Sequence, residues 1–231
     1  VGWIGAPSVG LPTCAVMGFS GLKNLEDVIN SKKPLKMAAS SPAGNTFADL
    51  PKILNLTIGT KFKVISGYKG ASGKALALQK REVDGICWGW ESMRTTARSM
   101  LDASGDDKLI PILTHRNPQD PEVKDLPQLR DVVKAKAGEK GAAIVNAWLG
   151  PNEFARSFSV PPGAPRKRLL TLRKAFKATL KDPQFLAEAK KSKLLITYVS
   201  GEEIEKHVAR ILEAPPKVKK SLQFLVRRGQ N

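Results

Sequence analysis

The residues best suited to chemistry form a polar loop, Ser-Ser-Pro-Ala-Gly-Asn-Thr, at positions 40–46. Hydroxyl groups and backbone N–H groups at the start of a helix can together bind an anion such as a carboxylate. A glycine in such a loop lets a ligand approach the backbone closely. We therefore predict ligand contacts from the members of this loop: Ser40, Ser41, Ala43, Gly44, Asn45 and Thr46.

The same loop also fits a simpler structural role. Asn and Thr are common N-cap residues, so Asn45 or Thr46 could serve only to begin the helix that follows. The residue types alone leave both roles open.

Two further candidates follow predicted strands. Tyr68, Lys69 and Gly70 come directly after one strand, and Trp88 ends the next. Open α/β sheets bind ligands at the C-terminal ends of their strands. We expect Tyr68 and the Gly70 amide to contact the ligand, and Lys69 to face solvent as most lysines do. Trp88 fits either an apolar wall of the site or packing in the core.

Catalytic and metal sites are not indicated. The pair Gly73-Lys74 is not a P-loop, because that loop has another Gly separated from the pair by four residues and a Ser or Thr directly after it, where this chain has Tyr68 and Ala75. The two histidines, His115 and His207, stand without a metal-ligand spacing. A nucleophile, a base and an orienting group do not form a recognisable set. We expect no enzymatic activity, no metal and no cofactor.

The cysteines and the chain ends say little about the compartment. Cys87 lies in an apolar run and is expected in the core, and the sequence does not decide whether it pairs with Cys14. No run reaches the ~18 consecutive apolar residues of a membrane span, and the first residues do not have the pattern of a signal peptide. The chain opens at Val1 in an apolar stretch, and we expect it to be cut from a longer protein.

The net charge of +17, from 38 basic and 21 acidic residues, favours anionic partners: nucleic acid, anionic lipid or a small carboxylate. Many of the basic residues recur along two predicted helices, 167–180 and 182–192, and in the tail at 217–231. Because aromatic residues that could stack on bases do not alternate with them, we favour a solvated helix face and expect no nucleic-acid binding. A basic nucleic-acid-binding protein remains the weaker alternative.

Short apolar runs and amphipathic segments alternate through the first half of the chain. Strands are predicted at 11–19, 35–39, 62–65, 83–88 and 109–114, with helical patterns between them. This alternation predicts a parallel α/β sheet with right-handed crossovers. Pro51, inside one helical pattern, predicts a kink or a later helix start.

The second half is richer in helices. A helix is predicted at 128–137, strands at 142–148, 156–160 and 194–198, and helices at 167–180, 182–192 and 204–212. Ser200 and Glu203, three residues apart, match a capping box for the last helix.

Several short motifs resemble, in the same order, those of one protein family. They are Gly21 to Ile29, Leu35 to Thr46, Tyr68-Lys69-Gly70, Gln79 to Ile86, Asp125-Leu126-Pro127, Val160 to Pro165, Asp182 to Phe185 and Tyr198 to Glu203. Over nearly its whole length the chain is similar to the receptors of tripartite tricarboxylate transporters, also called Bug proteins. It departs from them at Gly67, where the family has proline, and near Trp88 or Gly89, where the family often has an acidic residue.

The resemblance implies a type II periplasmic binding protein fold, with two α/β lobes around a ligand cleft and one lobe incomplete. The middle lobe would be residues 20–144. The other lobe would be built from 1–19 and 145–231, its N-terminal part being absent from this chain.

The implied function is that of a periplasmic, monomeric receptor that binds a small carboxylate and delivers it to the membrane permease subunits of the transporter. The alternative from another class is a ligand-sensing regulatory domain of similar bilobal fold, with a DNA-binding segment before Val1.

Overall fold

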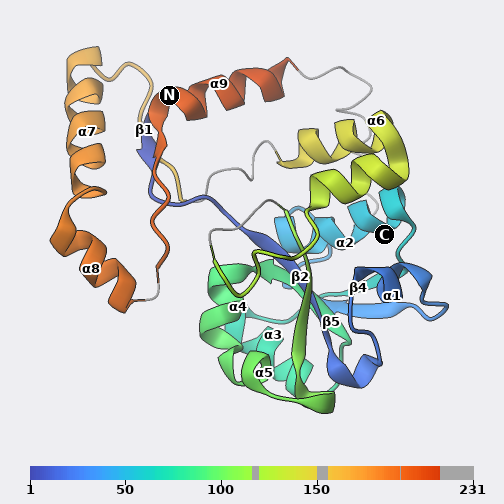
Figure 1. Cartoon of the computed structure of the whole chain (residues 1–231). Helices are drawn as coiled ribbons and strands as arrows, with labels where there is room; N and C mark the ends of the chain where they lie inside the picture. The colour runs from blue at the N-terminus through green and yellow to red at the C-terminus, as the bar shows by residue number, and fades with distance from the viewer. Residues whose placement is uncertain (116–119, 150–155, 193, 214–231) are drawn as a thin grey trace. The chain divides into compact units, whose positions relative to one another are not determined.

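The computed structural model describes residues 1–115, 120–149, 156–192 and 194–213, so part of the proline-rich loop and the basic tail lie outside the described residues. The chain divides into two compact units (Figure 1). Within the described residues, the smaller unit comprises 1–10 and those from 147 to 213, and the larger unit comprises 11–146.

The larger unit contains a five-stranded sheet of order β4-β3-β5-β2-β6. Its strands are β2 (Pro12–Met17), β3 (Leu35–Ala38), β4 (Phe62–Ile65), β5 (Gly85–Gly89) and β6 (Leu109–Thr114). All five lie where the sequence predicts strands. Strand β3 pairs in parallel with β4 and β5, as expected, but β2 is antiparallel to both of its neighbours, β5 and β6. The prediction of a wholly parallel sheet was therefore wrong, because a short buried apolar strand has the same residue pattern in either direction.

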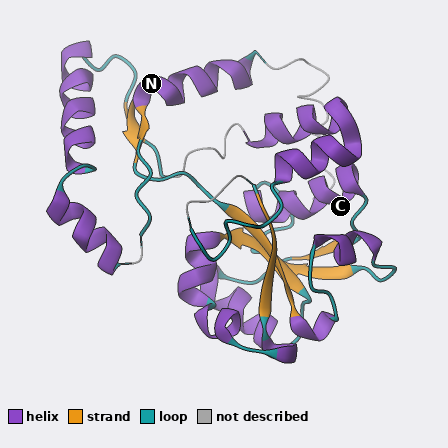
Figure 2. Ribbon diagram, in the orientation of Figure 1, coloured by secondary structure: helices purple, strands orange, loops and turns teal. Residues whose placement is uncertain are grey.

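Helices cover both faces of this sheet (Figure 2). They are α1 (Leu25–Asn30), α2 (Thr46–Ile58), α3 (Gly70–Gln79), α4 (Trp90–Thr96), α5 (Arg98–Asp102) and α6 (Leu129–Leu149), with short 3-10 turns at Gly18–Ser20 and Gly105–Asp107. Helix α2 begins at Thr46 and continues through Pro51. Of the two outcomes predicted from Pro51, the later helix start does not occur, since Asn45 caps the helix before the proline is reached, and the kink stays a prediction.

Helix α6 replaces a predicted strand. The segment 142–148 is helical and continues from the preceding helix across Gly138, whose φ of 62° interrupts the helical geometry. Ala142 and Val145, three residues apart, are both buried. That spacing places two residues on one face of a helix, whereas it would place them on opposite faces of a strand. The strand prediction was wrong because a short apolar run does not distinguish the two periods.

The core of the larger unit has a layer on each side of the sheet. On one side, Ala38, Ile86 and Trp88 pack with apolar residues of α3, α4 and α5. Neighbouring residues of a strand point to opposite faces, so Cys87, which precedes Trp88, points to the other side. There it forms a disulfide with Cys14, which lies directly opposite in the β2–β5 register. The structure thus answers the pairing question that the sequence left open.

The smaller unit contains a three-stranded antiparallel sheet of order β7-β1-β8 with three helices. The elements are β1 (Gly2–Ala6), β7 (Phe158–Val160), α7 (Arg166–Thr179), α8 (Pro183–Lys191), β8 (Val199–Ser200) and α9 (Gly201–Leu212). The prediction of a strand at 194–198 was wrong, since the residues that pair with β1 are Val199 and Ser200 of β8. The capping box is confirmed: the Ser200 N–H donates to Glu203 Oε2 at 2.8 Å, and the Glu203 N–H donates to Ser200 Oγ at 3.2 Å.

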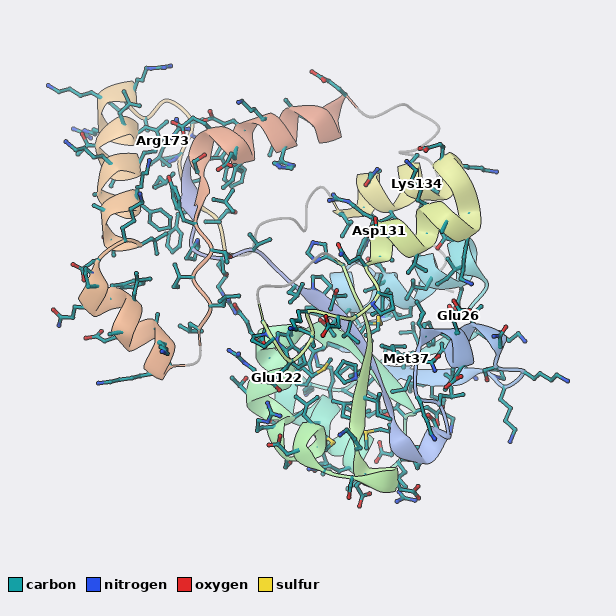
Figure 3. All side chains as sticks on the ribbon, in the orientation of Figure 1. Glu26, Met37, Glu122, Asp131, Lys134 and Arg173 are labelled. Atoms are coloured by element: carbon teal, nitrogen blue, oxygen red, sulfur yellow. A yellow bond between two sulfur atoms is a disulfide. The ribbon has the colours of Figure 1, made fainter. Side chains whose placement is uncertain are left out.

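Arg173 connects three elements of the smaller unit (Figure 3). Its Nε donates to the Trp3 carbonyl of β1 at 2.8 Å, and its terminal nitrogens form ion pairs with Glu202 at 2.7 Å and Glu205 at 2.6 Å on α9. The remaining basic residues of α7 are largely exposed, as expected for a solvated face.

The division of the chain differs in detail from the predicted lobes. The units divide at Gly10 and at Asn146, whereas the predicted lobes divide at 19 and at 144. Strand β2 accounts for the first difference, because it pairs with β5 and β6 of the larger sheet. The predicted lobe bounds stay a prediction.

Candidate anion site at the edge of the larger sheet

The candidate site lies where two parallel strands lead into helices. Strand β3 leads to α2, and β4 leads to α3, so the loops after these strands and the starts of both helices share the C-terminal edge of the sheet. Helix N-termini carry partial positive charge on their unpaired N–H groups. This edge therefore presents two positively polarised helix starts, of 13-residue and 10-residue helices.

Within the polar loop, Asn45 caps helix α2. Its Oδ1 accepts from the N–H groups of Phe47 at 3.0 Å and Ala48 at 2.9 Å, and its Nδ2 donates to Ser41 Oγ at 2.5 Å. The Ser41 hydroxyl in turn donates to the Ala43 carbonyl at 3.0 Å. The capping role that the sequence left open is thus observed, and these two side chains already have partners inside the loop. Their contact with a ligand stays a prediction.

Gly44 adopts the left-handed conformation, with φ of 79°, and a Cβ added to it would meet nothing within 4 Å. Its N–H donates to Asp49 Oδ1 at 3.1 Å. Burial raises the pKa of the Asp49 carboxyl, and the Gly44 N–H and the Lys52 ammonium oppose the shift. Gly44 therefore leaves space beside the loop, although its own N–H is directed inward. Ser40, before it, is exposed.

The Tyr68 to Gly70 segment begins α3. The Tyr68 N–H donates to the Ala39 carbonyl at 3.3 Å and the ring packs against the core, half-buried. Burial, and to a lesser extent the Glu82 carboxylate, raise the pKa of the Tyr68 hydroxyl. Gly70, with φ of 63°, and Lys69 are both exposed, and the exposure of Lys69 agrees with the prediction.

Trp88 is almost completely buried, at 3% exposed, in the layer that α3 and α4 cover. The packing role weighed for it is therefore observed. Its ring also contacts a residue that the sequence reasoning did not select: Lys74 Nζ lies 5.1 Å from the centroid of the Trp88 ring.

From the sequence, Lys74 is considered only as part of a possible P-loop and is not identified as a binding residue. It is 7% exposed, and its Nζ also lies 5.7 Å from the centroid of the Phe47 ring, in the first turn of α2. A signal existed in the sequence. With Ala71, Ala75 and Leu78, Lys74 forms an i, i+3, i+4, i+7 stripe, which is the buried face of an amphipathic helix.

Burial lowers the pKa of the Lys74 ammonium. Desolvation of the charged form is the cause, with no carboxylate close enough to oppose it among the residues that the structure describes. Chemically, the edge can therefore hold an anion. It offers a cation held between two aromatic rings, next to the starts of two helices.

In the ranges that the structure describes, no group of three or more His, Cys, Asp or Glu side chains is arranged to hold a metal ion. In the same ranges, none of the helices combines the length and the apolar character needed to cross a membrane.

Known proteins resemble this chain in their structure, whereas comparison of the sequence finds no relative. No protein-family model and no curated protein matches the sequence. A TctC solute-binding protein from Polaromonas matches with a TM-score of 0.63 and 13% identity, over 98% of this chain and 69% of that one. An R. palustris protein solved with adipate matches with a TM-score of 0.61 and 16% identity, over 95% and 69%. The periplasmic binding protein BugD matches with a TM-score of 0.58 and 18% identity, over 96% and 68%.

These likenesses define the class of fold. The chain has the α/β fold of periplasmic solute-binding proteins, as predicted. The structures that share it include TctC and Bug proteins, members of the receptor family that the sequence motifs resemble.

Proposed function

We propose that this protein is a solute receptor of a tripartite tricarboxylate transporter, which binds a small organic carboxylate and delivers it to the permease subunits. The observation that carries the proposal is the positively polarised edge of the larger sheet, with its buried Lys74, on a fold shared with solute-binding proteins. A carboxylate complements both the cation and the start of α3, where no side chain of the described residues caps the N–H groups. Binding and release require no chemical step, so the proposed role is that of a receptor and not of an enzyme, and a single chain suffices in the proposal.

A periplasmic location is supported by the Cys14–Cys87 disulfide. Disulfides form and persist in oxidising compartments such as the bacterial periplasm and are rare in the cytosol. Trapping free thiols in intact cells with an alkylating reagent tests this location. Recovery of the protein with both cysteines alkylated would contradict it.

We propose that the ligand contacts those residues of the two loops that remain accessible. Ser40 is exposed, Gly44 leaves open space beside the backbone, and Gly70 is exposed at the start of α3. Ser41, Ala43, Asn45, Thr46, Tyr68 and Trp88 belong to the same proposed site, with Asn45 shaping the loop and Trp88 supporting the cation.

A thermal-shift screen of the protein against C3 to C10 mono- and dicarboxylates and aromatic acids tests the function. Saturable stabilisation by one class of acid is expected, since a ligand that binds only the folded state raises its melting temperature. Replacing Gly44 by Trp should remove that stabilisation by filling the space beside the loop. Melting temperatures unchanged by every acid at millimolar concentration would reject the proposal.

A further inference from the structure

Lys74 is a buried cation without a charged partner. Its side chain is 7% exposed, and among the described residues no carboxylate or hydrogen-bond acceptor pairs with its ammonium. Burial of an unpaired charge is unfavourable, and contacts with aromatic rings offset that cost only in part. A methionine or leucine at this position of the apolar stripe would avoid that cost. A lysine here therefore needs an explanation other than folding.

The direction of the Lys74 side chain suggests binding as that explanation. Lys74 lies in the first half of α3, and its Nζ reaches the ring of Phe47, the second residue of α2. The ammonium is thus held beside the first turn of α2, whose positive end favours an anion even though Asn45 already caps the Phe47 and Ala48 N–H groups. It is not among the fully enclosed side-chain atoms that lack a hydrogen bond, so it keeps a contact with solvent.

The surroundings of the ammonium select the kind of anion. Phe47 and Trp88 present aromatic carbon next to the charge, and Phe47 is only partly buried. A carboxylate brings an apolar carbon next to its charged oxygens, whereas inorganic phosphate has oxygen on every side. The two rings would contact the apolar carbon of a carboxylate ligand. With inorganic phosphate they would instead remove water from its oxygens, which is unfavourable.

We infer that the Lys74 ammonium forms an ion pair with a carboxylate group of the ligand, and that the Phe47 ring packs against the adjacent carbon. This inference rests on the proposed receptor function and assigns the cation within it. It specifies an organic carboxylate with an apolar carbon next to the acid group, with inorganic phosphate excluded.

The test compares binding by the protein with binding by its Lys74→Met and Lys69→Met variants, using calorimetric titration with adipate, hexanoate, benzoate and inorganic phosphate. Met keeps the length of the side chain and removes its charge. Lys69 is the matched control, because it lies five positions earlier and is exposed. Charge-assisted hydrogen bonds are worth about 1.5–3 kcal/mol, so Lys74→Met should weaken binding of the preferred acid by about 10- to 100-fold. Lys69→Met should change it less than about threefold.

A stability measurement on the same variants separates binding from folding. Without ligand, Lys74→Met should melt at or above the temperature of the parent protein, because it removes an unpaired buried charge. A structural lysine would give the opposite result, a lower melting temperature. Lys74→Gln provides a second neutral variant if Met does not yield folded protein.

The outcomes distinguish the inference from the receptor function. Binding of an acid by the parent protein and equally by Lys74→Met would overturn the role of Lys74 and leave the receptor function standing. An equal loss in both lysine variants would also overturn it, since a general effect of surface charge would then be responsible. Tight binding of phosphate would overturn the assigned ligand class. Failure of the parent protein to bind any acid would reject the receptor function itself.

Discussion

Cys14 of β2 and Cys87 of β5 lie directly opposite each other on antiparallel strands, with Cα atoms 3.9 Å apart, and are joined by a disulfide. The bond closes a segment of the chain with a sequence separation of 73 residues. That segment contains β3, α2, β4 and α3, and with them the polar loop and Lys74. The cross-link therefore restrains the part of the larger unit that carries the candidate site.

Removal of this disulfide should destabilise the larger unit. A Cys14→Ala, Cys87→Ala variant is expected to lose about 2–4 kcal/mol of unfolding free energy, because the cross-link restricts the unfolded chain. Urea unfolding followed by tryptophan fluorescence measures the loss, and reduction of the parent protein should reproduce it. An unchanged urea midpoint in both experiments would show that the bond contributes nothing to stability.

Asn45 allows the capping role of the loop to be separated from its role in binding. Asn45→Ala removes the acceptor for the Phe47 and Ala48 N–H groups and should cost about 1 kcal/mol of stability. Asn45→Asp keeps that acceptor but adds a negative charge beside the anion site. We expect the Asp variant to keep its melting temperature and to bind a carboxylate several-fold more weakly. Equal affinity of the Asp variant and the parent would place the ligand elsewhere.

The Asp49 carboxyl should make stability depend on pH. Because burial raises its folded-state pKa above the unfolded value, ionisation of Asp49 opposes folding at neutral pH. The stability that this group contributes is present below the unfolded pKa and lost as pH rises through the folded pKa. Asp49→Asn cannot ionise and can still accept from the Gly44 N–H, so it should be more stable than the parent at pH 7.

The advantage of Asp49→Asn should shrink as the pH is lowered through the raised pKa of Asp49, because the parent carboxyl then becomes neutral as well. Chemical denaturation at several pH values measures it, with Asp106→Asn, an exposed acid, as the control. An advantage that is the same at every pH would assign the effect to packing and not to ionisation.

Ser200 and Glu203 should stabilise the start of α9. Ser200→Ala removes the acceptor for the Glu203 N–H and should cost the smaller unit about 1 kcal/mol. Hydrogen–deuterium exchange of the first-turn amides of α9 is the most local measurement, with faster exchange expected. Ser72→Ala, at an exposed position of the larger unit, is the control and should leave these amides unchanged.

The local pattern of the sequence was sufficient to locate most elements and to place the polar loop 40–46 before α2. Short apolar runs bounded by Gly, Pro and polar residues located all five strands of the larger sheet. The Ser200 and Glu203 spacing located the start of α9. The pattern failed at 142–148, because an apolar run of that length fits a helix or a strand until its neighbours decide which face is buried.

The sequence by itself thus determined the α/β class, the positions of the five strands of the larger sheet along the chain and a polar loop at the end of one strand, because these depend on residues close together in the chain. The tertiary structure alone decided the direction of β2, the pairing of Cys14 with Cys87 and the position of the Lys74 ammonium between Phe47 and Trp88. Each of these joins residues that are far apart in sequence. They are fixed by how strands pair and helices pack, which the local spacing of residue types does not contain.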